Sequence, residues 1–160
     1  MASQPINLSD AQLDQLQAEF AEQGYVVLPD VISQADRAGL VEQIRAAIEP
    51  LVGPAEFEAD VGYPGAPVDR SAPGGKTARR LLHAYARSAE FKALATQPQV
   101  AQVLGRFLAG SVCLSQCHHN CIMTKHPGFS SATLWHQDVR YWSYKCPELI
   151  SAWFALGQET

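Results

Sequence analysis

Hydrophobic residues recur at helical spacing along the N-terminal part of the chain, and this pattern predicts two capped helices. Ser9 is a typical N-cap with Gln12 as its capping-box partner, and Gly24 provides the stop. A second helix is expected to begin at Ser33 and to end before Pro50, because proline disfavours a helical conformation in the residue that precedes it.

The segments that follow these helices carry other signals. Residues 25–28, with the sequence YVVL, predict a short buried strand. Residues 52–76 are rich in glycine and proline and show no sustained period, which predicts a long loop. A helical pattern returns from Ala78, and Pro98 opens a further helix that Gly110 ends.

Beyond Gly110 the pattern changes from helical spacing to strands. β-Branched, aromatic and thiol side chains alternate in part with polar ones. The predicted strand segments are residues 111–125, 133–138, 139–144 and 149–156. Helices first and strands afterwards predict an α+β fold whose second half enters an antiparallel sheet or barrel, with residues 1–160 forming one domain.

Composition limits the possible classes of protein. The 160 residues are 47% hydrophobic and 9% aromatic, which excludes a wholly disordered chain. The net charge is −4 and the largest basic cluster is the pair Arg79 and Arg80, so no nucleic-acid partner is expected. No apolar run is long enough to span a membrane, and the first residues lack a secretory signal. We therefore expect a cytoplasmic protein with reduced cysteines and no membrane partner.

The densest chemical signal is the sequence His136–Gln137–Asp138 at the end of a predicted strand. Residues two apart on a strand point to the same face, so the imidazole and the carboxylate converge on one point. They supply two of the three ligands of the 2-His-1-carboxylate triad, which leaves coordination positions of Fe(II) open. A hydrogen-bonded His–Asp pair at the surface is the alternative interpretation of the same spacing.

Two stretches of the chain together resemble the phytanoyl-CoA dioxygenase family. They are GYVVLPDVIS at residues 24–33 and KHPGFSSATLWHQDVRYWSYKCPELISAWFAL at residues 125–156. The resemblance implies a double-stranded β-helix of the jelly-roll or cupin type, preceded by helices. It also implies an Fe(II)- and 2-oxoglutarate-dependent dioxygenase that hydroxylates an aliphatic C–H of a small-molecule substrate with O2.

The same resemblance assigns roles to individual residues. His136 and Asp138 match the first two iron ligands of the family. Four further positions match its 2-oxoglutarate pocket, namely Cys121, Trp153, Lys125 and Arg80. A solvated lysine at the end of a strand is an equal alternative for Lys125. Because halogenases of this broader group replace the carboxylate by a small residue, the retained Asp138 favours hydroxylation.

The family takes its third iron ligand and an arginine that grips 2-oxoglutarate from its C-terminal strands. No histidine follows Asp138, and the only arginine after it is Arg140. We therefore expect the C-terminal strands to be absent here, which makes the domain incomplete. The chain is then the N-terminal portion of a longer protein or a catalytically inactive truncated fragment.

A zinc-binding module is a further alternative, because Cys113, Cys117 and Cys121 supply thiolates that suit zinc. On one strand, successive thiols of this set lie roughly 13 Å apart at about 3.3 Å per residue. One ion cannot bind all three without a turn, so the spacing favours small residues that line a barrel interior.

Overall fold

A computed structural model describes residues 7–116, 120–126, 128–130, 136–143, 145–146 and 148–157. The helices are α1 (Asp10–Gln23), α2 (Gln34–Ile48), α3 (Ala84–Arg87), α4 (Ala89–Ala95) and α5 (Pro98–Phe107). The strands are β1 (Ala55–Phe57), β2 (Ala78–Leu82) and β3 (Cys121–Met123), and the 3-10 turns are η1 (Glu58–Asp60) and η2 (Asp138–Tyr141). This is a mixed α+β structure, in agreement with the expected class. None of the described helices combines the length and the apolar character that a membrane span requires.

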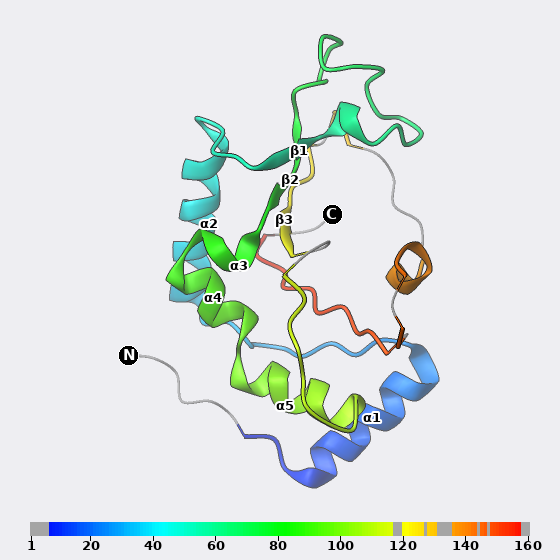
Figure 1. Cartoon of the computed structure of the whole chain (residues 1–160). Helices are drawn as coiled ribbons and strands as arrows, with labels where there is room; N and C mark the ends of the chain where they lie inside the picture. Colours follow the sequence, from blue (N-terminus) through cyan, green and yellow to red (C-terminus); the bar gives the residue numbers. More distant parts are fainter. Residues whose placement is uncertain are drawn as a thin grey trace.

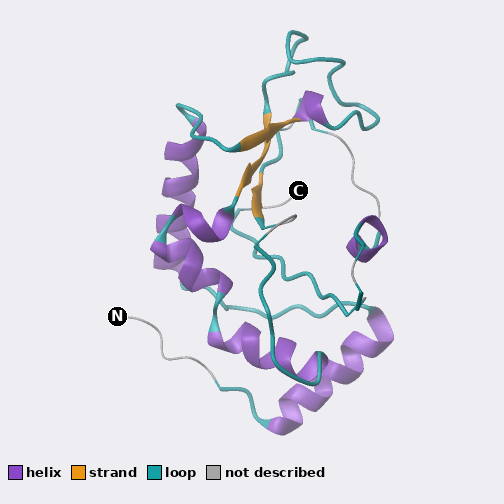
Figure 2. Cartoon of the chain, viewed as in Figure 1, coloured by secondary structure: helices purple, strands orange, loops and turns teal. Residues whose placement is uncertain are grey.

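The helices form two groups around a small sheet (Figure 1). Helices α2, α3 and α4 lie beside the sheet, and α1 packs against α5 at some distance from it. Loops connect much of the remaining chain, and the strands are short (Figure 2). The longest excursion, residues 61–77, leaves the sheet between η1 and β2.

The helix ends follow the capping signals in the sequence. The Ser9 hydroxyl accepts a hydrogen bond from the Gln12 backbone N–H, and the Gln12 side chain accepts one from the Ser9 N–H, which is a complete capping box. Gly24 ends α1 with φ 80°, in the left-handed region that glycine adopts without strain. Ser33 caps α2, and Pro98 occupies the first turn of α5. These predicted boundaries are confirmed, although α5 ends at Phe107, before Gly110.

The sheet is antiparallel with the order β1–β2–β3. Glu56 lies opposite Arg80, and Phe57 lies opposite Ala78, so Arg79 is an extra residue of β2 with no counterpart on β1. Such a β-bulge bends the strand and redirects its side chains. On the other side, Arg80 lies opposite Met123.

One face of this sheet carries the hydrophobic core. Leu81 is fully buried and lies opposite Ile122 on β3, which is 8% exposed. Leu40 of α2 and Phe91 of α4 complete the buried cluster with these two side chains. Burial of each such side chain contributes about 1.5–3 kcal/mol. The core therefore fixes β2 and β3 against α2 and α4.

The structure contradicts three predictions for the first half of the chain. Residues 25–28 belong to no described strand, and Tyr25 and Val27 are 49% and 72% exposed. Residues 52–76 are a loop only in part, because they include β1 and η1. The helical pattern expected from Ala78 begins only at Ala84, with α3 and α4. Residues Ala78–Leu82 form strand β2 instead, since pairing on both of its edges and burial of Leu81 outweigh the helical propensity of its residues.

The strands predicted for the second half form only in part. Within residues 111–125, strand β3 forms at Cys121–Met123, while residues 111–116 belong to no strand. The segments predicted at 133–138 and 139–144 contain η2 among their described residues. Residues 149–156, which all lie in the last described range, also belong to no strand. No jelly-roll sheet is therefore seen in the described part of the chain, where the strands pair as β1–β2–β3 alone.

Arg87, the last residue of α3, binds three backbone carbonyl oxygens. Its Nε donates to Leu82 at 2.8 Å, and its two terminal nitrogens donate to Val52 at 3.1 Å and to Pro54 at 2.6 Å. Burial lowers the pKa of the Arg87 guanidinium from its usual value. The side chain ties α3 to the segment that leads into β1 and to the end of β2.

Candidate functional site

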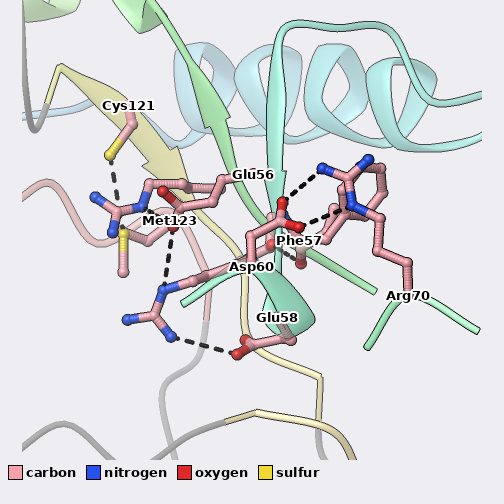
Figure 3. A network of polar contacts seen from close by, with 11 residues as sticks. Glu56, Phe57, Glu58, Asp60, Arg70, Cys121 and Met123 are labelled. Atoms are coloured by element: carbon pink, nitrogen blue, oxygen red, sulfur yellow. Dashed lines mark hydrogen bonds and ion pairs between the residues drawn. The ribbon is translucent and has the colours of Figure 1, made fainter. Parts of the chain in front are cut away.

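Two of the predicted pocket residues, Arg80 and Cys121, come together on the sheet. Leu82 lies opposite Cys121 and Arg80 lies opposite Met123, so these side chains share one face of β2 and β3. The Cys121 Sγ lies 3.9 Å from the Met123 sulfur, and Figure 3 shows these two side chains pointing toward each other. Burial raises the pKa of the Cys121 thiol, and the positive charge of Arg80 acts in the opposite direction. The thiol is therefore held in its neutral form beside a guanidinium.

Glu56 joins this face as a carboxylate that contacts two arginines. Its Oε1 accepts a hydrogen bond from Arg80 Nε at 2.7 Å and lies 3.5 Å from Arg79 Nε. Sequence reasoning missed Glu56, because residues 52–76 were expected to form a loop. The available signal was the spacing of two acidic residues in the sequence Glu56–Phe57–Glu58, ahead of the consecutive pair Arg79 and Arg80.

Glu58 continues the series of charges into the interior. It is fully buried, and its Oε2 accepts a hydrogen bond from Arg79 Nη1 at 3.3 Å. Arg79 is 5% exposed, and its guanidinium carbon lies 5.0 Å from the ring centroid of Tyr63. Glu58, Arg79, Glu56 and Arg80 thus alternate in sign from the interior outward. We refer to these four residues together with Cys121 as the sheet cluster.

A further ion pair lies next to the sheet cluster, between η1 and the loop that follows it. Arg70 donates two hydrogen bonds to the carboxylate of Asp60, at 2.8 and 2.9 Å, and its guanidinium carbon lies 4.5 Å from the ring centroid of Phe57. These hydrogen bonds hold the pKa of the Asp60 carboxyl below its usual value and raise that of Arg70. Figure 3 shows Glu56, Glu58 and Asp60 following one another along the same stretch of chain. The Asp60–Arg70 pair fastens the loop of residues 61–77 to η1.

His136 and Asp138, which we call the His–Asp pair, lie together at the start of η2. His136 Nε2 lies 3.2 Å from Asp138 Oδ1, with the two side chains 37% and 20% exposed. Gln137 between them is extended, with φ −110° and ψ 119°, so its neighbours project to the same side although no strand forms there. Ser151 donates a hydrogen bond from Oγ to Asp138 Oδ2 at 2.8 Å. The other carboxylate oxygen faces the imidazole.

The spacing of the His–Asp pair fits two neighbouring ligands of one metal ion. A nitrogen and an oxygen that each lie about 2.1 Å from a metal, at a right angle, are about 3 Å apart. Among the described residues, no group of three His, Cys, Asp or Glu side chains is placed to hold a metal ion. The His–Asp pair therefore offers two donor atoms at the spacing of neighbouring metal ligands.

The remaining predicted residues lie outside both groups. Lys125 follows β3 by two residues and is exposed. Trp153 is 69% exposed and lies two residues after Ser151. Figure 1 shows η2 apart from the sheet, so the structure unites Arg80 with Cys121 and His136 with Asp138 but leaves the two groups separate.

The cysteines proposed for zinc have different surroundings. Cys113 is exposed, Cys121 is partly buried in the sheet cluster, and Cys117 lies outside the described residues. Cys121 is therefore accounted for by packing against Arg80 and Met123.

A histidine and a carboxylate two residues apart, both turned to one side, are typical of mononuclear iron oxygenases. Residues 20–160 match the model of the phytanoyl-CoA dioxygenase (PhyH) family, and the chain belongs to this family. The family consists of oxygenases that typically depend on Fe(II) and 2-oxoglutarate. No curated protein and no solved structure matches the chain.

Proposed function

We propose that this chain carries the iron- and cosubstrate-binding residues of an Fe(II)- and 2-oxoglutarate-dependent dioxygenase that hydroxylates an aliphatic C–H of a small molecule. The observation that supports it most directly is the 3.2 Å approach of His136 Nε2 to Asp138 Oδ1, in a chain of the phytanoyl-CoA dioxygenase family. Bound iron would supply activation of O2, with 2-oxoglutarate as the source of two electrons.

The His–Asp pair would hold the metal in a defined way. His136 must be neutral so that Nε2 presents a lone pair, and Asp138 must be ionised so that Oδ1 presents a negative charge. Ser151 donates its hydroxyl proton to Oδ2, and Oδ1, which lies beside His136 Nε2, would be the oxygen that binds the metal. A partner of this kind orients a metal ligand and limits it to one oxygen.

Arg80 of the sheet cluster would hold one carboxylate of the cosubstrate. The Arg80 guanidinium offers charge-assisted hydrogen bonds to a carboxylate, and arginine is suited to gripping both oxygens. The Cys121 thiol, kept neutral by burial, adds no negative charge that would repel this carboxylate. We assign Trp153 and Lys125 to the same pocket on the basis of the family resemblance alone.

The experiment that tests this function measures decarboxylation of the cosubstrate. Succinate is quantified after the protein has been loaded anaerobically with Fe(II), mixed with 2-oxoglutarate and exposed to O2. In a full-length context that supplies the third iron ligand, we expect succinate from the native sequence and none from Asp138→Asn. Asp30→Asn is the matched control, because Asp30 is exposed and its φ of 55° is a conformation that asparagine tolerates. Equal succinate from Asp138→Asn and Asp30→Asn would exclude the proposed role of the His–Asp pair.

A further inference from the structure

We infer that Glu56 is a positioning residue that presents the Arg80 guanidinium to an anionic ligand, a carboxylate of the 2-oxoglutarate class. The inference rests on the proposed function. It concerns a side chain to which neither the family resemblance nor the sequence pattern gave a role. Its basis is the contact of one carboxylate oxygen, Glu56 Oε1, with two arginines that are consecutive in the sequence.

The bulge in β2 makes this double contact possible. Consecutive residues of a regular strand point to opposite faces of the sheet, so one carboxylate opposite Arg80 would not reach Arg79. Arg79 is the extra residue between the pairs Glu56–Arg80 and Phe57–Ala78. The irregular backbone brings the Nε atoms of both arginines to Glu56 Oε1, at 2.7 Å for Arg80 and 3.5 Å for Arg79. Bulges next to functional sites commonly redirect a side chain in this manner.

The two buried residues of the sheet cluster, Glu58 and Arg79, hold Glu56 in place. Arg79 is itself held by the fully buried carboxylate of Glu58 at 3.3 Å and by the ring of Tyr63. A buried guanidinium between two carboxylates is difficult to displace, because its movement breaks ion pairs that are shielded from water. Glu56 is therefore a fixed acceptor for Arg80 rather than a freely rotating side chain.

The Glu56–Arg80 hydrogen bond determines which nitrogen atoms of Arg80 face a ligand. Glu56 engages Nε, at the side of the guanidinium. The two terminal nitrogens form the other edge of the fork, which matches the two oxygens of a carboxylate. The Arg80 side chain is only 13% exposed, and this burial restricts it to the observed orientation. A ligand carboxylate thus meets an arginine that has already lost its rotational freedom.

Two titrations of the full chain test the inference. Glutarate, which has two carboxylates and no keto group to chelate a metal, is titrated into the metal-free protein by calorimetry. 2-Oxoglutarate is titrated anaerobically into the Fe(II)-loaded protein, so that no turnover occurs. The variants are Glu56→Ala, which removes the acceptor, Glu56→Gln, which keeps an oxygen acceptor for Arg80 Nε, and Arg80→Ala. Glu42→Ala is the matched control, since Glu42 forms an exposed ion pair with Arg45 on α2.

We expect Glu56→Ala to weaken glutarate binding about tenfold, in the range seen for residues that orient a ligand-binding group. Glu56→Gln should restore most of this loss, Arg80→Ala should abolish binding, and Glu42→Ala should leave the Kd unchanged. An equal Kd for Glu56→Ala and the native sequence, or an equal loss in Glu56→Ala and Glu56→Gln, would overturn the positioning role.

A comparison of the two titrations tests the proposed function separately from the role of Glu56. 2-Oxoglutarate that binds the Fe(II)-loaded protein no more tightly than glutarate binds the metal-free protein would overturn the proposed function, even if the dependence on Glu56 holds. A native protein that binds neither ligand overturns both. Urea midpoints of all variants identify a general loss of folding, in which case the Glu56→Gln result decides.

Discussion

The sheet cluster and the His–Asp pair differ in how their polar groups are held. In the sheet cluster, Glu58 and Arg79 are 0% and 5% exposed, and each charge contacts the next between β2 and the segment formed by β1 and η1. The His–Asp pair lies at the start of a short 3-10 turn, where the conformation of Gln137 and a hydrogen bond from Ser151 orient the two side chains. The first arrangement depends on tertiary packing, and the second depends largely on local backbone.

This difference indicates how far a bound ligand would stabilise the side chains of each group. A carboxylate ligand would add to a network that is already anchored at its buried end. A metal ion would instead cross-link two side chains that are 37% and 20% exposed. We therefore expect substitution of the buried Arg79 to affect folding and substitutions around the His–Asp pair to affect metal binding.

The largest effect is expected for Arg79→Met. It leaves the buried Glu58 without its guanidinium, and loss of one partner of a buried pair lowers the free energy of unfolding by about 3–5 kcal/mol. Urea denaturation followed by circular dichroism measures it. Arg45→Met is the control, because its ion pair with Glu42 is 74% and 75% exposed and contributes at most about 1 kcal/mol. Similar small losses in both variants would show that the sheet cluster does not hold the fold.

His136→Ala is expected to weaken Fe(II) binding by at least about 100-fold, since loss of a ligand exceeds the effect of losing its neighbours. Iron retained per chain after anaerobic loading and desalting is measured by elemental analysis. His126→Ala serves as the control, because this imidazole is exposed and accepts a hydrogen bond from the Gly128 N–H. Loss of iron in His126→Ala to the same extent would contradict the assignment of the His–Asp pair.

Ser151→Ala is expected to weaken Fe(II) binding by about tenfold without changing the urea midpoint, because Ser151 orients a ligand rather than packing in a core. The comparison with Ser143→Ala, an exposed serine near η2, separates this role from a general effect of the substitution. Equal iron affinity in the two variants would mean that backbone alone orients Asp138.

The smallest effect is expected for Asp60→Asn, as a change in urea midpoint that depends on pH. The Arg70 guanidinium lowers the folded-state pKa of Asp60, so the stability it contributes is complete above the ordinary value near 3.8 and is lost as the pH falls through the lowered pKa. The native chain should exceed the variant in urea midpoint at pH 7, and this difference should shrink below pH 4. A constant difference across that range would show that the pair does not titrate with folding.

The sequence predicted those parts of the fold that are determined locally. Ser9, Gln12, Gly24 and Ser33 act through neighbours within one helical turn, and their roles are confirmed. Strand β2 was expected to be a helix because the residues Ala78–Leu82 favour helices by propensity. Its conformation depends instead on partners at 55–57 and 121–123, which are remote in the sequence.

The candidate site shows the same division between local and remote contacts. The His–Asp pair follows from a spacing of two residues and an extended residue between them. The meeting of Arg80 with Cys121 and Glu56 requires the register of three strands and the bulge at Arg79, which no local pattern encodes. Ser151 reaches Asp138 across 13 positions of sequence, and its type alone gives no indication of that contact.

Arg87 has a consequence for the cooperativity of this part of the fold. Helix α3 is a single turn of 4 residues, and a helix of that length has no stability of its own. Its arginine binds one carbonyl oxygen 5 positions away and two others 33 and 35 positions away. The side chain at the end of α3 therefore bonds to the backbone of the approach to β1 and to the end of β2. Order in one implies order in the other, and the two segments form as a single unit.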